Sequence, residues 1–273
     1  RSYLDAIAMK RFTIDFTLLV HINLILMEND AKSCYDRIII SLCSILFQRF
    51  GVPAAFLRMW TETLKQMRYH VRTAHGISKL FYASAAAYLL FGTGQGSTAS
   101  PAAWLIISTS LLATLSKHSP GMVFSNPTRT NTITRIGDSF VDDTGIGETD
   151  PNPTQPTAPL TMISSMQRLA QRKERLLFGT GGRLELKKCF WVLIHWKWEQ
   201  GVATLSTMND VPQELHLTSS SNNRRILIRR LEVTTRFKTL GTYLSGDGKS
   251  TGEYQYKSDT IASHLRRLRK THH

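Results

Sequence analysis

The chain has 273 residues, 42% of them hydrophobic, so it is long enough to bury a core as one large domain or two lobes and is not a disordered arm. With 34 Lys and Arg against 20 Asp and Glu, the formal charge is +14, which suits a polyanionic partner such as nucleic acid. The three cysteines have no metal-type spacing, which argues against a disulfide framework and a zinc module and favours a reducing interior.

The first predicted element is a strand. A short apolar run at residues 22–27 leads to Glu28, Asn29 and Asp30, and Tyr35 and Asp36 then begin a helical pattern. Asp30 is therefore expected where a strand ends. Helix capping is the alternative role for an acid in this place, and Asp36 fits that role better than Asp30.

Two helices and a hairpin are predicted next. The helix that begins at Asp36 ends at Gly51, a second helix runs from Pro53 to about residue 67, and residues 68–88 form a hairpin-like region.

A glycine-rich segment at residues 91–96 leads to Ser100 and Pro101, and residues 101–115 are apolar with helical composition. An ordinary loop followed by a buried helix accounts for the apolar residues but not for the glycines. The glycines additionally let a backbone approach a bulky ligand such as a nucleotide or a template strand.

Asp142 and Asp143 are predicted at the tip of a hairpin. Residues 133–141 are expected to form one strand, and residues 144–147 begin its return. Two acids before Thr144 are also an ordinary turn signature between apolar runs. If the strand that ends at Asp30 lies beside this hairpin, the three acids meet.

The second half of the chain is predicted to combine helices and strands. Residues 148–159, with four prolines, are expected to form an exposed loop, followed by a basic amphipathic helix at about 160–178. Strands are expected at 184–186, 189–198, 202–205, around 215 and at 226–231, and a basic helix at about 258–270.

The order of these segments resembles the reverse transcriptases, particularly those of retroelements. The resemblance rests on Asp30 with Tyr35-Asp36, on Gln95-Gly96 with Ser100-Pro101, on Phe140-Val141-Asp142-Asp143, and on weaker matches at 184–189 and 237–244. It implies an α+β fold with a right-hand polymerase palm, in which helices cover an antiparallel sheet, together with partial fingers and a truncated thumb.

The resemblance also implies a division into domains. Residues 1–29 would be partial fingers and palm entry, and residues 30–210 the palm with a fingers-like insertion at about 52–92. Residues 211–273 would be the palm–thumb junction and a partial thumb. Because little chain precedes Asp30 or follows the thumb match, we expect a palm-centred piece of a larger retroelement polyprotein.

The chemistry implied is two-metal nucleotidyl transfer. Two Mg²⁺ ions, for which Mn²⁺ can substitute, lower the pKa of the primer 3′-hydroxyl and neutralise charge that develops on the triphosphate. Asp30 and Asp142 would bridge the ions, with the Ala31 carbonyl and Asp143 as further ligands. Lys188 would contact a phosphate or protonate the pyrophosphate leaving group. Lys187 in that role, or a solvated lysine pair, is the alternative.

Substrate contacts follow from the same resemblance. Tyr35 would act as a steric gate against a 2′-hydroxyl, which predicts deoxynucleotides, whereas packing into the core is the alternative use of this aromatic ring. Gln95, Gly96 and Ser100 would bind substrate. Leu240 and Gly241 would form the primer grip, for which an ordinary hairpin is the alternative.

The predicted function is therefore template-directed DNA synthesis from RNA or DNA. Its partners would be an RNA template, a DNA primer, deoxynucleoside triphosphates and other domains of the parent polyprotein, in a cytoplasmic or nuclear ribonucleoprotein. No membrane partner is expected, because the apolar stretches at 80–91 and 102–115 are shorter than a bilayer span and no secretory signal is visible. A catalytically inactive nucleic-acid-binding remnant and an RNA-dependent RNA polymerase stay open as alternatives.

Overall fold

The computed structural model describes residues 2–83, 92–94, 97–150 and 158–271. The predicted α+β class is confirmed: a six-stranded sheet in the order β11-β12-β8-β1-β7-β6 lies between helices. The strands are β1 (Asn23–Asp30), β6 (Gly137–Phe140), β7 (Asp143–Asp150), β8 (Phe190–Ile194), β11 (Leu215–Thr218) and β12 (Arg225–Leu231).

The expectation of a purely antiparallel sheet needs correction. Four of the neighbouring pairs are antiparallel, but β8 and β12 are parallel. The chain between them forms a separate hairpin and then β11, a connection long enough to bring β12 back in the direction of β8. The sheet is therefore mixed.

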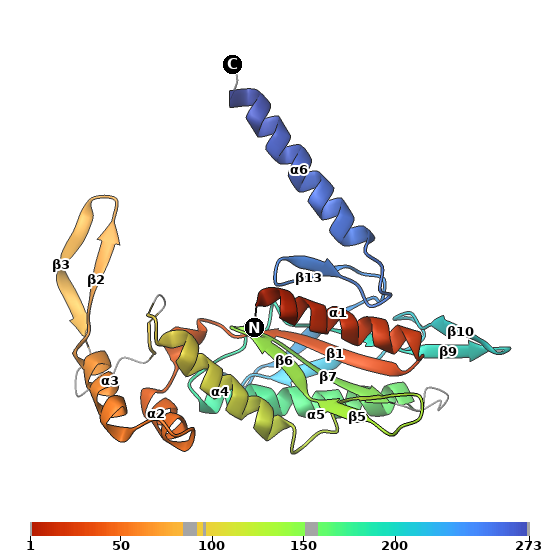
Figure 1. Cartoon of the computed structure of the whole chain (residues 1–273), viewed down its shortest axis with the longest axis horizontal. Coiled ribbons are helices and arrows are strands. Elements are labelled where there is room, and N and C mark those ends of the chain that lie inside the picture. The colour runs from red at the N-terminus through yellow and green to blue at the C-terminus, as the bar shows by residue number, and fades with distance from the viewer. Residues whose placement is uncertain (1, 84–91, 95–96, 151–157, 272–273) are drawn as a thin grey trace.

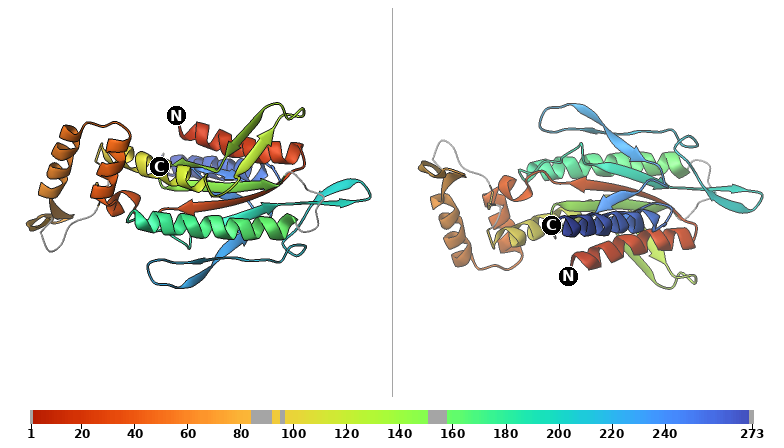
Figure 2. Two further views of the ribbon diagram at one scale, coloured as in Figure 1. Left: turned by 90° about the horizontal axis from the view of Figure 1, so that it is seen from below. Right: turned by 90° about the horizontal axis from the view of Figure 1, so that it is seen from above.

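Successive side chains of β1 point to opposite faces of the sheet and belong to two different core clusters. Ile25 and Met27 belong to the larger core cluster, which includes residues of α4 (Ser100–Leu115) and α5 (Ala158–Gly179). Leu24 and Leu26 belong to the smaller cluster, which includes residues of α1 (Tyr3–Leu19) and of the hairpin β13–β14 (Phe237–Thr239 and Thr242–Leu244). We call these the α5 face and the α1 face (Figures 1 and 2).

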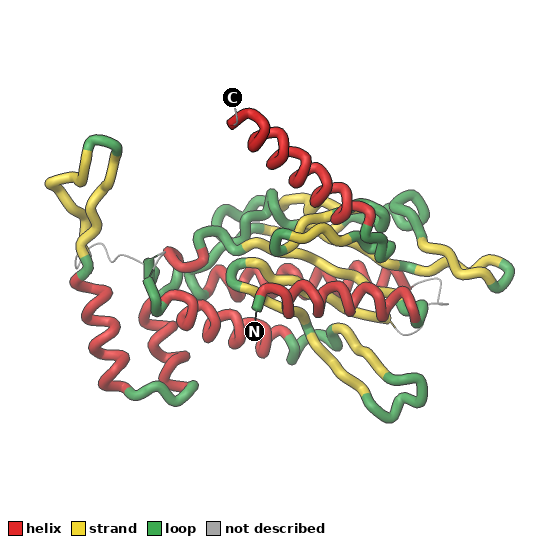
Figure 3. Tube along the Cα trace, turned by 45° about the horizontal axis from the view of Figure 1, so that its top comes forward, coloured by secondary structure: helices red, strands yellow, loops and turns green. Residues whose placement is uncertain are grey.

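Several elements extend from this centre. The 3₁₀ turn η1 (Cys34–Arg37) and the helices α2 (Ile40–Arg49) and α3 (Ala54–Gln66) lead into the hairpin β2–β3 (Arg68–Thr73 and Gly76–Ala83). The hairpins β4–β5 (Met122–Ser125 and Thr132–Arg135) and β9–β10 (Trp196–Glu199 and Val202–Leu205) also project (Figure 3). Helix α6 (Thr251–Thr271) stands away from the sheet (Figure 1). In the described part of the chain, no helix is long and apolar enough to cross a bilayer.

Three predicted strands differ from the observed ones. Residues 133–141 divide at Ile136 into β5 and β6, because the first part pairs with β4 and the second with β7. The segment 189–198 divides at His195 into β8 and β9. Residues 184–186 form only one isolated bridge, between Leu184 and Ala31.

Part of the loop predicted at residues 148–159 is regular structure. Strand β7 continues to Asp150, because it pairs with β1 as far as Asn23. Side chains add to this pairing: the Glu148 carboxylate accepts from the Ser119 hydroxyl at 2.5 Å and the Thr149 hydroxyl accepts from the Val123 N–H at 2.8 Å. Helix α5 already begins at Ala158. The intervening residues 151–157 lie outside the described part of the chain.

Helix α1 was not predicted, because its apolar residues do not gather on one face. Lys10, Thr13 and Thr17 are buried, whereas Phe12 and Leu19 are exposed. A capping box between Ser2 and Asp5 starts the helix, since each side chain bonds to the other residue's backbone N–H.

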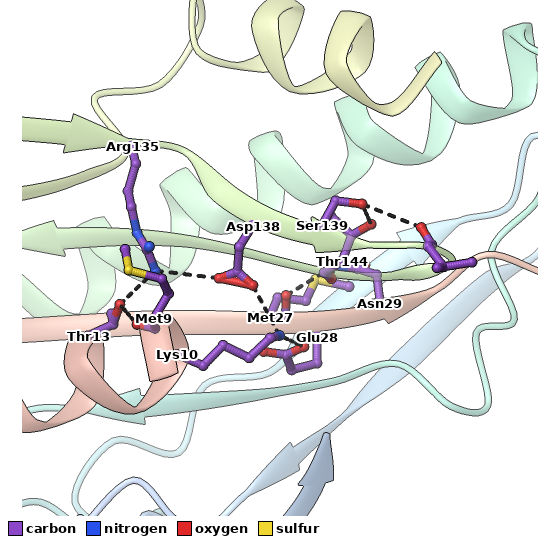
Figure 4. Close-up of polar contacts among 11 residues, drawn as sticks. Met9, Lys10, Thr13, Met27, Glu28, Asn29, Arg135, Asp138, Ser139 and Thr144 are labelled. Carbon is purple, nitrogen blue, oxygen red and sulfur yellow. Dashed lines mark hydrogen bonds and ion pairs between the residues drawn. The ribbon is translucent and has the colours of Figure 1, made fainter. Parts of the chain in front are cut away.

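Ion pairs hold α1 on the sheet (Figure 4). The Lys10 ammonium lies 2.5 Å from the Glu28 carboxylate of β1 and 3.4 Å from the Asp138 carboxylate of β6. Arg135 donates to the Thr13 hydroxyl at 2.6 Å and lies 3.4 Å from Asp138. Burial alone would lower the pKa of Lys10, but the Glu28 and Asp138 carboxylates outweigh it and raise that pKa.

Gly145 on β7 makes room for this cluster. A Cβ atom added there would lie 2.9 Å from the Glu28 carboxylate and 3.0 Å from the Lys10 ammonium. The glycine that follows the paired acids therefore serves close packing within a strand, and not a turn.

We predict that Lys10→Met lowers the free energy of unfolding, measured by urea titration, by about 3 kcal/mol, because it leaves two partly buried carboxylates without their ammonium partner. Lys65→Met is the matched control. The Lys65–Glu62 ion pair, 2.9 Å long, joins two exposed side chains, and its loss should change stability by less than about 0.5 kcal/mol. Equal losses in the two variants would contradict the anchoring role of Lys10.

Candidate active site at the ends of β1 and β7

The last residue of β1 lies opposite the first residue of β7. Asp30 pairs with Asp143 in the antiparallel register, one step beyond the pair of Asn29 with Thr144. Opposite residues of an antiparallel pair project from the same face of a sheet with their Cβ atoms about 5 Å apart. Since Glu28 binds Lys10 on the α1 face, Asp30 and Asp143 also lie on that face.

Asp142 lies in the turn that connects β6 to β7. Phe140 pairs with Asp143, so Val141 and Asp142 form a two-residue turn and Asp143 already belongs to the strand. The predicted tip, Asp142-Asp143, is thus shifted by one residue. Val141 has a φ of 55°, which is rare for a β-branched residue, and the Trp104 indole N–H donates to the Val141 carbonyl.

Ala31 connects this turn to the end of β1. Its N–H donates to the Asp142 carbonyl at 3.2 Å, while Ala31 also forms an antiparallel bridge with Leu184 on the other side. In an extended residue the N–H and the C=O point to the same side. The Ala31 carbonyl, predicted as a metal ligand, therefore lies on the same side as Asp142.

Electrostatics show that the acids influence one another. Burial raises the pKa of Asp143, and the negative charges of Asp142, Glu28 and Asp30 add to that effect, while Lys10 opposes it. The pKa of Tyr35 is also raised, by burial first and then by the charges of Cys34 and Asp142. The neighbouring thiol of Cys34 has its pKa raised to about 11 by burial and by Asp142.

Lys188 reaches the first of the predicted acids. Its ammonium lies 2.6 Å from the Asp30 carboxylate, and the hydrogen bond to Asp30 raises the pKa of Lys188. The lysine side chain is 66% exposed, whereas that of Asp30 is 17% exposed. Of the two candidate lysines, Lys188 makes this ion pair and Lys187 is exposed to solvent.

The glycine-rich segment is described only in part. Gln95 and Gly96, both predicted to bind substrate, lie outside the described residues. Ser100 is buried, and its hydroxyl donates to the carbonyls of Thr93 at 3.1 Å and Gly94 at 2.8 Å. In this structure Ser100 therefore anchors the loop, with its hydroxyl turned into the protein.

Tyr35 is tied to that loop. It lies in the 3₁₀ turn η1, is half-buried and packs against the larger core cluster. Packing into the core was the alternative use considered for this ring. Its carbonyl accepts from the Thr93 N–H at 2.8 Å. Gly92 lies against Asp36, the residue that follows Tyr35. A Cβ atom added to Gly92 would lie 2.5 Å from the Asp36 Cα atom, so only glycine fits at this position of the glycine-rich segment.

Leu240 and Gly241 form the turn of the β13–β14 hairpin, with φ angles of 49° and 83°. Positive φ at both central positions is the geometry that favours tight hairpins. Phe237 and Leu244 pack in the same cluster as Ile14, so the hairpin covers the α1 face. This is the face that carries Asp30 and Asp143.

Asn29 is a site residue that sequence analysis did not identify. Its carboxamide donates to the carbonyls of Met27 at 3.0 Å and Thr144 at 3.3 Å, so it joins β1 to β7 beside the pair of acids. The polar Glu28-Asn29 step within an otherwise apolar strand was the available signal. Glu28 binds Lys10 and Asn29 holds the strands in register.

Lys173 is a second such residue, on the α5 face behind the acids. It is fully buried, and burial lowers the pKa of its ammonium to about 7. Within the described residues, neither its Nζ atom nor the Asn29 Oδ1 atom has a hydrogen-bond partner. Both residues line a cavity of about 20 Å³, together with Asp142 and Thr144. A lysine among the apolar positions of the predicted 160–178 helix was the sequence signal.

The carboxylates have the chemistry that Mg²⁺ prefers. Burial first, and then repulsion between the acids, raises the pKa of Asp143, and a divalent cation would relieve that repulsion. Their arrangement is nevertheless incomplete. Among residues 2–83, 92–94, 97–150 and 158–271, no group of three or more His, Cys, Asp or Glu side chains is placed to hold a metal. Asp30 and Asp143 share a face, and Lys188 contacts Asp30.

No protein-family model and no curated protein matches this sequence. A solved structure of telomerase from Candida albicans, in complex with a fragment of telomeric RNA, matches at 14% identity with a TM-score of 0.38. The match covers 91% of this chain and 34% of the telomerase chain, so this chain spans about a third of that protein. A likeness at this level does not establish a family.

Lys173 generates a stability prediction with a defined pH dependence. Below pH 7 this lysine is charged in both the folded and the unfolded states, so the cost of burying the charge is fully present. Between about 7 and 10.5 the folded form is neutral while the unfolded form still binds the proton, so wild-type stability rises with pH.

We expect Lys173→Met to raise the free energy of unfolding by roughly 1–4 kcal/mol at about pH 6, with a gain that shrinks as the pH approaches about 10. Urea titrations across this pH range measure the effect. Lys187→Met, at an exposed position, is the control and should follow wild type at every pH. A Lys173→Met variant that is less stable than wild type at all pH values would contradict the depressed pKa.

Proposed function

We propose that this chain is the palm-centred part of a retroelement reverse transcriptase, which synthesises DNA on an RNA or DNA template by two-metal nucleotidyl transfer. The observation that carries the proposal is the in-register pair of Asp30 and Asp143, with Asp142 in the adjoining turn and Lys188 on Asp30. Three distant segments of the chain contribute these groups near one edge of the sheet, and their order along the chain is that of the reverse-transcriptase motifs.

Each group then has a chemical role. Asp30, Asp142, Asp143 and the Ala31 carbonyl would hold two Mg²⁺ ions, which when bound activate the primer 3′-hydroxyl and stabilise charge on the triphosphate. Lys188 has a long, exposed side chain, so its ammonium can leave Asp30 for a phosphate oxygen or protonate the leaving pyrophosphate. Tyr35 would exclude nucleotides with a 2′-hydroxyl.

The domain division belongs to the same proposal. The insertion at about 52–92 contains α3 and the β2–β3 hairpin, which project to one side of the sheet as fingers would (Figure 1). The β13–β14 hairpin, on the α1 face, would grip the primer through Leu240 and Gly241, and α6 would be part of the thumb. RNA template, DNA primer and deoxynucleoside triphosphates would bind on the α1 face beside the acids, and the net charge of +14 over the whole chain favours polyanionic partners.

A catalytically inactive, nucleic-acid-binding remnant is the second candidate function. The observation that favours it is the ion pair between Lys188 and Asp30, which already satisfies one of the acids. The remnant would bind RNA and DNA through the net positive charge of the chain but would not extend a primer. An RNA-dependent RNA polymerase is a further alternative that the choice of nucleotide distinguishes.

The first test of the proposal is Asp142→Asn. Primer extension with Mg²⁺ and deoxynucleotides should fall by at least about 100-fold, because a metal ligand is lost. The affinity for a primer–template duplex, measured by filter binding, should stay within about 2-fold, because no phosphate contact is lost. Asp15→Asn on α1, which removes an exposed carboxylate paired with Arg11, should leave both quantities unchanged.

Extension that survives Asp142→Asn contradicts the assignment of the acids. If the wild-type protein binds the duplex but does not extend the primer with Mg²⁺ or with Mn²⁺, the result supports the inactive remnant. A terbium luminescence titration provides a readout independent of turnover: wild type should bind this carboxylate-seeking ion more tightly than Asp142→Asn does.

The second test addresses the choice of sugar. Tyr35→Ala should increase the use of ribonucleotides relative to deoxynucleotides by roughly 10-fold or more, because the ring that excludes the 2′-hydroxyl is removed. The ratio of kcat/KM values for the two nucleotides measures this selectivity. Wild-type preference for ribonucleotides would instead indicate an RNA polymerase, and an unchanged ratio would show that Tyr35 serves only to pack against the core.

A further inference from the structure

A groove of about 740 Å³ lies on the side of the molecule formed by α2, α4 and α5. Its floor is one face of α4, with Ile107 and Leu111 one turn apart. Leu42 and Leu46 of α2 form one wall, and Leu176 of α5 lies on the other. In Figure 1 these three helices lie low in the view, with α1 and α6 above them.

The surface of the groove is mostly apolar, and the hydroxyl groups that line it from α4 already have partners. Ser110 and Thr114 line it from α4, but their hydroxyls donate to the Ile106 and Ser110 carbonyls of the same helix, both at 2.8 Å. The groove therefore offers a ligand mainly aliphatic side chains, and none of its lining residues is aromatic.

The α5 wall of the groove carries a row of arginines. Arg168, Arg172 and Arg175 recur at helical spacing, line the groove and are exposed. Among the ion pairs between described residues, none involves these three guanidinium groups.

The glutamine beside these arginines is not available to a ligand. Gln171 also borders the groove, but its carboxamide accepts from the Thr218 N–H and donates to the Thr218 carbonyl, both at 2.8 Å, along the edge of β11. The arginine row is thus the main polar feature that the groove presents to a partner.

We propose that this groove binds an acidic amphipathic helix of a partner protein. The apolar face of such a helix would fill the space between α2 and α5, and carboxylates along one edge would pair with Arg168, Arg172 and Arg175. An apolar groove walled by two helices is the shape that receives an amphipathic helix, and arginine forks bind carboxylates in bidentate geometry.

Charge and chemistry select this occupant over two others. A second copy of this chain would bring a charge of +14 to an arginine-lined surface, so self-association is opposed electrostatically. Single-stranded nucleic acid stacks its bases on aromatic rings, which the groove lacks. The site is on the opposite side of the sheet from Asp30 and Asp143, so the inference goes beyond the proposed polymerase function and does not depend on it.

The experiment uses a fluorescein-labelled helical peptide of about 18 residues, with leucines at helical spacing on one face and glutamates on both flanks. A second peptide carries lysine in place of each glutamate. Fluorescence anisotropy with the whole chain should show binding of the glutamate peptide that weakens with salt, and at least about 10-fold weaker binding of the lysine peptide.

Arg172→Glu combined with Arg175→Glu should lower the affinity for the glutamate peptide by at least about 10-fold, because repulsion replaces two ion pairs. The matched control combines Arg58→Glu and Arg72→Glu, exposed residues of α3 and β2 outside the groove, and should change the affinity by less than about 2-fold. Leu111→Asn tests the floor and should also weaken binding. When the glutamate peptide is bound, backbone hydrogen exchange of the protein should slow in α2, α4 and α5.

Three results would overturn the proposal: no binding of the glutamate peptide, equal effects of the two double variants, or protection outside these helices. A single-stranded RNA that displaces the peptide from wild type, and that the groove variant no longer binds, would assign the groove to nucleic acid instead. A dimer in sedimentation velocity that the groove variant abolishes would assign it to a second copy.

Discussion

The register between β1 and β7 is the constraint on which the candidate site depends. A shift of one residue would move Asp30 and Glu28 to the opposite face of the sheet and would separate them from Asp143 and Lys10. The contacts that fix the register lie within a few residues of the acids. Lys10 binds Glu28 in the space that Gly145 leaves by having no side chain. Asn29 donates to the Thr144 carbonyl, and the Ala31 N–H donates to the Asp142 carbonyl. The strand pairing and the site are therefore stabilised together.

The sequence was sufficient where local chemistry decides the structure. The apolar run before Asp30 and the acids after Phe140 predicted a strand end and a hairpin turn, and Asp30 does lie opposite Asp143. The Gly and Pro signals around residues 51–53 placed the end of α2 and the start of α3 correctly, since these residues act on their immediate neighbours.

The sequence was insufficient where distant partners decide the structure. Helix α1 buries Lys10 together with Ile14 and exposes Phe12, so its sequence shows no single apolar face. The burial of Lys10 is explained only by the Glu28 and Asp138 carboxylates that lie beneath it. Likewise, residues 133–141 have continuous strand character, and only the two separate partners, β4 and β7, divide them at Ile136. Single-sequence patterns contain neither piece of information.

The charges around the candidate site fall into an inner and an outer group, and the proposed metal binding depends on the outer one. In the inner group, Lys10 and Arg135 balance the carboxylates of Glu28 and Asp138 within the protein. The outer group has three carboxylates, those of Asp30, Asp142 and Asp143, and its ion pair is with one lysine.

In a chain of net charge +14, the outer group is a local excess of negative charge at the edge of a sheet. The lysine that partly offsets it is mostly exposed, so its ammonium can return to solvent, but the Asp30 carboxylate is only 17% exposed and then needs another positive charge beside it. Under the proposed function, the inner ion pairs would keep the strands in place while a divalent cation replaces Lys188 at the outer acids.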